Sequence, residues 1–431
     1  MRWSAPVFTI LVSTALLPAT ALGTAIEGDG PTDLTISKES PAAAEFRAGV
    51  QKLVNRDLAG AEASFRKAQQ LAPKSPEPLI ALADIEARKG NPAAAEALLQ
   101  QARKVSPNHV AVHVAFGRLY KSRGDFQRAK TEFEAALKVA PSSLPAQMEL
   151  ADIYLRTGDV KRAVQEYERI TAARPKDAGA HFGLGVALAA AGRSTDAAAA
   201  LEKAAQLAPR DPEPLRMLAR VEVEAKRYPQ ALAALDRAIK VAPTATTLQM
   251  DRASVLLASG DAKGAIATAQ SVAKAHPSDA AVQGRLGNLL VATGDKAGAR
   301  QAFAKSIELS QADPQTLNNA AWLEVDAKGD LAKAHAWATR ATELRPRDPS
   351  YLDTLAWVER ARGDLPKAEA TLVRALALAP GAAALHYRLG IVRAEQGANA
   401  KAAESFEQAL KAGLPAPMAA DAKQRLDALK K

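Results

Sequence analysis

Residues 113–141 read HVAFGRLYKSRGDFQRAKTEFEAALKVAP, with helix-forming residues on both sides of a Gly-Asp pair. Gly124 can end one helix in a left-handed conformation, and Asp125 can cap the start of the next. Pro141 cannot continue the second helix, because it lacks an N–H group and its ring clashes with the preceding turn. The stretch therefore predicts two helices that fold back on each other as a hairpin.

This hairpin pattern recurs along the chain at a fixed interval. Prolines stand at one constant spacing at Pro73, Pro107, Pro141, Pro175, Pro209, Pro243 and Pro277. Alanines keep the same spacing at Ala61, Ala95, Ala129, Ala163, Ala197, Ala231 and Ala265. The small alanine lets two helices approach, and a larger residue four positions later fills the gap beside it. A hairpin cannot bury its apolar face alone, so the repetition predicts a solenoid of stacked units.

The repeated positions resemble the tetratricopeptide repeat. One unit shows the pattern as His113, Phe116, Gly117, Tyr120, Ala129, Phe133, Ala136 and Pro141, and the next shows it as Gln147, Leu150, Ala151, Tyr154, Ala163, Tyr167, Ile170 and Pro175. Eleven units can be placed within residues 42–416, at 42–75, 76–109, 110–143, 144–177, 178–211, 212–245, 246–279, 280–314, 315–348, 349–382 and 383–416. The resemblance implies an all-α, right-handed superhelical solenoid, and residues 417–431 are expected to form a C-terminal capping helix.

The N-terminus has the pattern of a secretory signal peptide. Residues 1–23 contain one positive charge, an apolar run and the segment Ala19-Thr20-Ala21, which fits a cleavage site. The alternative is an uncleaved membrane anchor. Residues 24–41 are expected to form a flexible leader. No other segment is long and apolar enough to span a membrane, so we expect the mature chain to be periplasmic or secreted.

Composition and motifs argue against catalysis. The chain contains no cysteine, which excludes disulfides, thiol chemistry and cysteine-based zinc sites. Among the six histidines, His113, His181 and His386 share one repeat position, which a packing role explains. There is no phosphate-binding loop and no nucleophile motif, and the repeats leave no stretch for a catalytic domain. We therefore expect no enzyme activity, no cofactor and no metal.

The formal net charge of the chain is +10, which raises the question of an anionic partner. The charged residues are scattered, and most fall where a helix faces water. This distribution favours a solvated surface over a clustered nucleic-acid site. We expect no nucleic-acid partner.

Two tryptophans mark a candidate binding site. The segments LNNAAW (317–322) and YLDTLAW (351–357) place Trp322 and Trp357 at the same position of consecutive repeats. First helices line the concave groove in the family, so the resemblance implies that both indoles lie near a ligand. Asn318, Asn319 and Asp353 lie about one turn earlier and are expected to supply hydrogen bonds. The alternative is that both indoles only pack between repeats.

Polar residues elsewhere on the expected first helices are further groove candidates. They are Arg118, Lys121, Asp152, Arg156, Arg216, Arg220 and Asn288. Each is also explained as an ordinary solvated helix residue. The clamp that some family members use for C-terminal carboxylates is absent, because its positions include Phe46, Val50, Ile80, Asp84, Val114 and Arg118.

The spacing of the repeats changes once. Pro346 stands one residue beyond the position that two further repeats after Pro277 would give it. We place the extra residue in the helix that contains LNNAAW, which is the first helix of its repeat. We therefore expect this helix to be one residue longer than the first helices of neighbouring repeats.

These features predict a non-catalytic scaffold of the bacterial cell envelope that binds protein partners through its groove. LNNAAW and YLDTLAW are also similar to segments of tetratricopeptide proteins associated with PEP-CTERM and exopolysaccharide loci, which implies a role in assembly or export of surface polysaccharide. The alternative function is carbohydrate binding in exopolysaccharide biosynthesis. The expected partners are envelope proteins in the first case and polysaccharide in the second.

Overall fold

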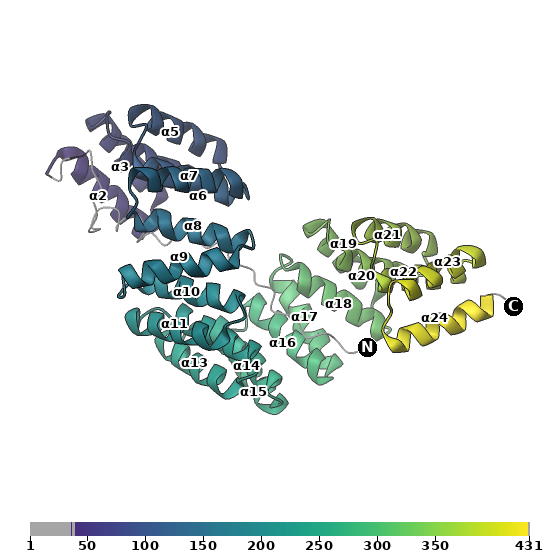
Figure 1. Ribbon diagram of the computed structural model, residues 1–431. Helices are drawn as coiled ribbons and strands as arrows, with labels where there is room; N and C mark the ends of the chain where they lie inside the picture. The colour runs from purple at the N-terminus through teal and green to yellow at the C-terminus, as the bar shows by residue number, and fades with distance from the viewer. Residues whose placement is uncertain (1–35, 37–38, 430–431) are drawn as a thin grey trace. The chain divides into compact units, whose positions relative to one another are not determined.

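The computed structural model describes residue 36 and residues 39–429 (Figure 1). The predicted signal peptide at 1–23 and most of the predicted leader lie outside these residues. Within the described residues the chain forms twenty-three α-helices and no strand. It divides into two compact units. The N-terminal unit ends at Val241, and the C-terminal unit begins at Ala242. None of the described helices has both the length and the apolar character needed to cross a bilayer.

Helices in both units alternate between a first and a second helix of each repeat. The N-terminal unit contains α2 (Pro41–Val54), α3 (Leu58–Leu71), α4 (Glu77–Arg88), α5 (Pro92–Val105), α6 (Val110–Ser122), α7 (Phe126–Val139), α8 (Leu144–Arg156), α9 (Val160–Ala173), α10 (Ala178–Ala190), α11 (Ser194–Leu207), α12 (Glu213–Glu224) and α13 (Tyr228–Val241). Even-numbered helices up to α22 are the first helices, and odd-numbered helices are the second helices.

The C-terminal unit continues the alternation and ends with one unpaired helix. It contains α14 (Thr246–Ala258), α15 (Ala262–Ala275), α16 (Ala280–Thr293), α17 (Lys296–Leu309), α18 (Pro314–Asp326), α19 (Leu331–Leu344), α20 (Pro349–Ala361), α21 (Leu365–Leu378), α22 (Ala383–Glu395), α23 (Asn399–Lys411) and α24 (Ala416–Leu429). Helix α24 buries Ala422 and Leu426 against the last repeat. The prediction of an all-α repeat solenoid of about eleven helix pairs with a terminal capping helix is confirmed.

Turns between paired helices contain the predicted left-handed glycine and aspartate N-cap. Gly124 adopts a φ of 75°, and the Asp125 carboxylate accepts a hydrogen bond of 3.1 Å from the backbone N–H of Arg128. Lys226 stands where other turns have glycine and adopts a φ of 59°, which is strained for a residue with a side chain. The left-handed turn is therefore kept by the repeat even where the sequence does not favour it.

The extra residue of the repeat lies in a turn, so the prediction of a longer first helix was wrong. Helix α18 has 13 residues, as do α20 and α22. The turn from Ala327 to Asp330 is longer instead, with Lys328 at a φ of 51°. The carboxylate of Glu324 fills this wider turn, because it accepts a hydrogen bond of 2.9 Å from the Asp330 backbone N–H.

Candidate partner-binding surface

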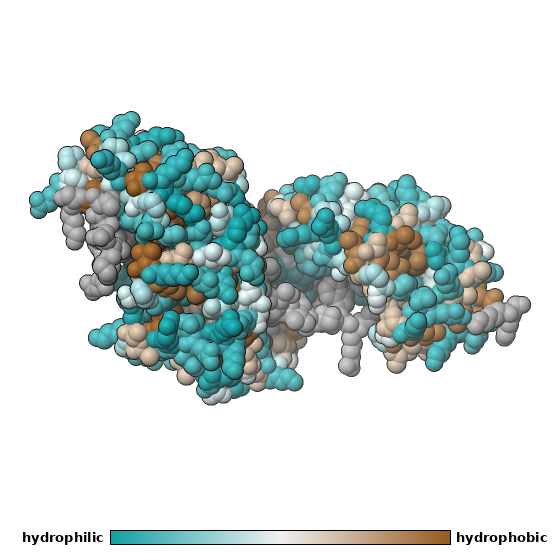
Figure 2. Space-filling view, turned by 45° about the horizontal axis from the view of Figure 1, so that its top comes forward, coloured by the Kyte–Doolittle hydropathy of each residue, from teal (hydrophilic) through white to brown (hydrophobic). Residues whose placement is uncertain are grey.

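Successive first helices pack on one another from α4 through α6, α8 and α10 to α12 in the N-terminal unit, and as the pairs α14–α16 and α18–α20 in the C-terminal unit. Within each unit, side chains at equivalent positions of these helices therefore share one face, which we call the first-helix face of that unit. In the N-terminal unit it carries Arg118, Lys121, Asp152, Arg156, Arg216 and Arg220; in the C-terminal unit it carries Asn318, Asn319, Trp322, Asp353 and Trp357. Figure 2 shows one side of the molecule, on which hydrophilic residues predominate and apolar surface forms only small areas.

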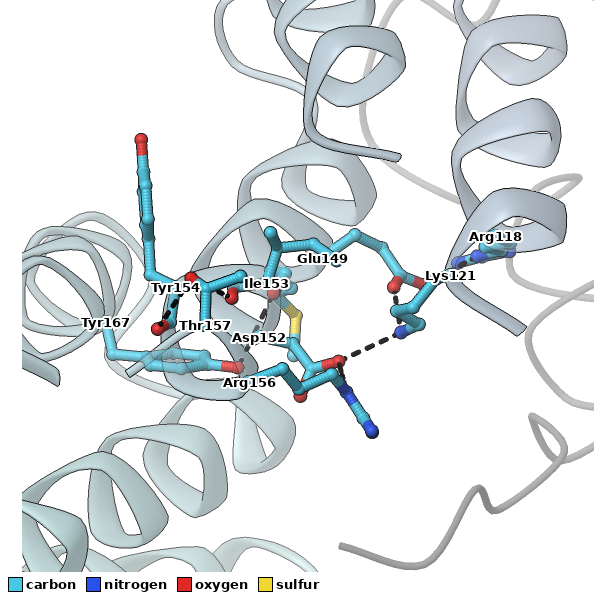
Figure 3. A network of polar contacts seen from close by, with 10 residues as sticks. Arg118, Lys121, Glu149, Asp152, Ile153, Tyr154, Arg156, Thr157 and Tyr167 are labelled. Carbon is cyan, nitrogen blue, oxygen red and sulfur yellow. Dashed lines mark hydrogen bonds and ion pairs between the residues drawn. The ribbon is translucent and has the colours of Figure 1, made fainter. Parts of the chain in front are cut away.

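Four of the predicted residues meet in one polar network between α6 and α8 (Figure 3). Arg118 Nε donates to Glu149 Oε1 at 2.6 Å. Lys121 Nζ lies 2.5 Å from Glu149 Oε2 and 3.0 Å from Asp152 Oδ2. Arg156 Nε donates to the same Asp152 oxygen at 2.8 Å. The network joins two neighbouring repeats through three cations and two carboxylates.

Glu149 is the centre of this network. Its side chain is only 8% exposed, and burial alone would raise its pKa. The positive charges of Arg118 and Lys121 outweigh that effect, so the pKa of Glu149 lies below its usual value and the carboxylate is ionised at neutral pH. A buried carboxylate with two cationic partners fixes the positions of those cations.

Arg216 and Arg220 lie on α12, apart from this network. Arg216 Nη1 is 3.6 Å from Glu213, and Arg220 Nε is 3.9 Å from Glu224 on the same helix. These pairs are too long for strong hydrogen bonds. Helix α10 separates the two charged regions and contributes partly exposed Phe182 and Val186.

In the C-terminal unit, Asn319 is buried in an amide chain across first helices. Its Nδ2 donates to Asn288 Oδ1 of α16 at 2.8 Å, and its Oδ1 accepts from Gln315 at 2.8 Å. Neighbouring Asn318 has a buried Oδ1 with no hydrogen-bond partner among the described residues. Trp322, on the same helix, is half-buried and packs against the apolar cluster between α14 and α20.

Trp357 lies in a cationic setting. The guanidinium carbons of Arg360 and Arg388 lie 4.4 and 4.9 Å from its ring centroid, a range typical of cation–π contacts. Arg388 Nη1 also lies 3.1 Å from Asp353 Oδ1. Burial raises the pKa of Asp353 to about 6, and the opposing attraction of Arg388 does not cancel this effect. The indole of Trp357 is therefore already in contact with two arginines.

The structure thus groups the predicted residues unevenly. Arg118, Lys121, Asp152 and Arg156 form one network, Asp353 and Trp357 are joined through Arg388, and Asn318, Asn319 and Trp322 share α18. Glu149, Arg360 and Arg388 were missed by sequence reasoning. The sequence did contain a signal for Glu149. It is a separation of 31 residues, which recurs in the pairs Arg118–Glu149, Lys121–Asp152 and Asn288–Asn319.

Two of the histidines at the shared repeat position contact the preceding turn. Nε2 of His181 is 3.0 Å from the carbonyl oxygen of Pro175, and Nε2 of His386 is 2.8 Å from that of Pro380. His113 instead places Nδ1 2.8 Å from Glu132. Across the described residues, no group of three or more His, Cys, Asp or Glu side chains is arranged to hold a metal ion.

Three family models match the sequence. One, described as the cilia and flagella-associated protein 70 C-terminal domain, matches residues 107–323, which is half of the chain. Two described as tetratricopeptide repeat match residues 53–119 and 354–422. These matches fall in both units. No curated protein matches the sequence.

Solved structures similar to the chain share little sequence with it. The structure of the APC/C hetero-tetramer Cut9-Hcn1 has 14% identity and a TM-score of 0.45, covering 91% of this chain and 97% of that chain. The structure of Naa15/Naa10 bound to HypK-THB has 18% identity and a TM-score of 0.32, covering 86% and 68%. Yeast Tom70 has 13% identity and a TM-score of 0.39, covering 79% and 93%.

Proposed function

The chain belongs to the tetratricopeptide-repeat family, and from that premise we propose that it is a non-catalytic scaffold which binds extended segments of partner proteins along its first-helix face. The repeat fold is suited to protein–protein interaction, because stacked helix pairs present a long continuous surface. Families with this architecture generally act as scaffolds without catalysis. The specificity of such a surface depends on side chains that the repeat pattern leaves free to vary.

The observation that carries this proposal is the network of Arg118, Lys121, Glu149, Asp152 and Arg156. It spans two repeats on a surface where the repeat pattern requires no charge. Its guanidinium groups are half-buried and held by carboxylates, so they are ordered before a partner arrives. Ordered donors lose less conformational entropy on binding than free side chains do.

We further propose that the partners are proteins of the bacterial cell envelope, and that the complex serves assembly or export of surface polysaccharide. The support is in the sequence. Residues 1–23 have the pattern of a secretory signal, and LNNAAW and YLDTLAW are similar to segments of proteins associated with exopolysaccharide loci.

A crosslinking capture from cell envelopes tests the scaffold. The tagged full chain is compared with Arg156→Glu on the first-helix face and with Arg162→Glu on the second helix α9. We expect the wild type and Arg162→Glu to capture the same discrete proteins and Arg156→Glu to lose them. Equal capture by all three chains would contradict binding through this face, provided that circular dichroism shows all three folded.

A second candidate function, carbohydrate binding, is favoured by one feature of the C-terminal unit. Asn318 Oδ1 and Asp353 Oδ1 are buried without a hydrogen-bond partner among the described residues, although Asp353 Oδ1 is within ion-pair distance of Arg388. Each lies about one helical turn before a half-buried tryptophan. An aromatic ring beside acceptor oxygens suits a sugar, whose ring packs on the indole while its hydroxyls donate.

Fluorescence titration separates this candidate from the scaffold. The ligand is a mixture of oligosaccharides, prepared by partial hydrolysis of the exopolysaccharide of the bacterium that makes this protein. It is added to the wild-type protein, to the Trp322→Phe and Trp357→Phe variants, and to the control variant Trp337→Phe on α19. Carbohydrate binding predicts a saturable fluorescence change that the first two variants lose and the control keeps. A titration without any saturable change would exclude this sugar as the ligand.

A further inference from the structure

Three arginines on the first helices of the N-terminal unit have unused hydrogen-bond donors. Arg118 and Arg156 each use Nε to bind a carboxylate of α8, and no partner among the described residues binds their terminal guanidinium nitrogens. Among the described residues, the ion-pair partner of Arg220 is Glu224, 3.9 Å from its Nε. Each of these three guanidinium groups therefore has donors available for a ligand.

These arginines are more restrained than those on the second helices. The side chains of Arg118, Arg156 and Arg220 are 33%, 17% and 23% exposed. Arg128 and Arg162, on second helices, are 64% and 60% exposed. Partial burial strengthens a charge-assisted hydrogen bond and reduces the entropy that a ligand must overcome. The first-helix arginines are thus better suited to bind an anion than the average surface arginine.

An apolar strip separates the arginines. Arg118, Asp152, Val186 and Arg220 occupy the same position of four successive repeats, so Val186 of α10 lies between α8 and α12 on the first-helix face. Phe182 lies one turn earlier on α10, and both side chains are partly exposed. The face therefore changes from a charged network with one excess positive charge on α6 and α8 to an apolar strip on α10, and then to Arg216 and Arg220, each beside a glutamate, on α12.

We infer that this face of the N-terminal unit binds an extended acidic segment of a partner protein, in which carboxylates flank an apolar side chain. The inference rests on the proposed scaffold function and specifies the chemistry of its partner. Each guanidinium can donate two parallel hydrogen bonds to one carboxylate. The apolar side chain packs on Val186 and Phe182 and is removed from water there.

The spacing of the helices sets the length of the segment. Neighbouring packed helices lie about 10 Å apart, so α8 and α12 are separated by about 20 Å. An extended chain covers that distance with about six residues. The predicted ligand therefore carries two acidic groups about six residues apart, with an apolar residue midway between them.

A fluorescein-labelled peptide of sequence GEEGSLSGEEG provides a direct test, by fluorescence anisotropy with the full chain. Saturable binding is expected, and it should weaken about tenfold or more when GQQGSLSGQQG replaces the peptide, since each pair loses a charge-assisted bond. GEEGSGSGEEG, which lacks the leucine, should bind more weakly than the parent peptide. Equal anisotropy curves for the acidic and the glutamine peptide would overturn the inference.

Protein variants locate the binding. Arg156→Gln and Arg220→Gln are expected to weaken binding of GEEGSLSGEEG about tenfold or more, and Arg162→Gln, on α9, should leave it unchanged. Equal losses in all three variants, or equally tight binding of a single-stranded oligonucleotide of the same charge, would show attraction to polyanions in general and overturn the inference. If the peptide fails while envelope proteins are still captured through Arg156, the scaffold function stands and only the acidic ligand is rejected.

Discussion

Single side chains set how closely the two helices of a repeat approach. At four crossings a glycine of the first helix faces a phenylalanine of the second; the pairs are Gly49–Phe65, Gly117–Phe133, Gly287–Phe303 and Gly390–Phe406. A Cβ atom added at these glycines would lie 2.4 to 2.7 Å from the ring, which is too close for carbon atoms. Where the second helix has leucine, the facing residue varies: Ala83 faces Leu99, but Gly185 faces Leu201, and a Cβ atom added there would lie 2.5 Å from the leucine Cγ.

A double-mutant cycle tests this pairing. Gly117→Ala should destabilise the N-terminal unit by about 1–2 kcal/mol, because the clash with Phe133 exceeds the gain in helix propensity. In a Phe133→Leu background the same change should cost less, because the Ala83–Leu99 pair shows that leucine can pack against alanine at this position. Denaturant unfolding followed by far-ultraviolet circular dichroism measures both. Equal effects of Gly117→Ala in the two backgrounds would show that the ring does not select the glycine.

The titration of Asp353 predicts a pH dependence. Folding raises the pKa of this carboxyl from 3.8 to about 6, so the folded state binds the proton more tightly than the unfolded state does. Stability is therefore lost as pH rises from about 4 to about 6, by about 3 kcal/mol at most. Asp353→Asn removes this loss, so the variant should gain stability relative to the wild type across that range. Urea unfolding monitored by tryptophan fluorescence measures the difference, and a difference that does not change with pH would contradict the assignment.

Helices in this chain begin at residues that the sequence identifies well. Asp57, Asp159, Asp261, Asp295 and Asp364 each accept a hydrogen bond from the first turn of a second helix. Helix α23 is different, because Ala398 stands at its N-cap and supplies no side-chain hydrogen bond. Its first-turn N–H groups therefore lack the side-chain acceptor that the aspartates provide elsewhere.

Installing the missing cap should stabilise the last repeat. Ala398→Asp is expected to raise the stability of the C-terminal unit by about 1 kcal/mol, and Asp364→Ala, which removes the cap of α21, should lower it. Hydrogen exchange of the first-turn amides reports on each helix separately. Unchanged exchange in α23 of the Ala398→Asp variant would mean that the new carboxylate does not reach the helix.

The helices were predictable because caps, turn glycines and apolar spacing are local signals that recur in each repeat. The site was only partly predictable. Sequence identified Arg118 and Asp152 as positions on the first helices. Their partners lie 31 residues away on the neighbouring first helix, and the contact depends on how the two helices are rotated against each other. The extra residue before Gly329 was predicted to lie in the first helix, but it lies in the turn. Sequence spacing shows that one residue has been added, but it does not show whether the helix or the turn contains it.

At the scale of the whole molecule, the solenoid must cover the apolar side of its last repeat. Helix α24 does so, with Ala422 and Leu426 packed in one cluster with Ile391 and Phe406. A chain that ends at Gly413 exposes this cluster, so we expect it to self-associate as its concentration rises. Light scattering after size exclusion measures this, with Leu426→Ser as a milder variant and exposed Lys423→Ser as the control. A truncated chain that scatters as the full chain does would show that α24 is dispensable.

Partner proteins are proposed to bind along the first helices. A photo-crosslinking amino acid placed in living cells at Val186, on the first-helix face, and at Gln165, an exposed residue of the second helix α9, tests this proposal most directly. We expect discrete protein adducts from Val186 and none from Gln165, with fewer adducts when Arg156→Gln is added. Adducts of equal yield from both positions, or from Gln165 alone, would contradict the proposal.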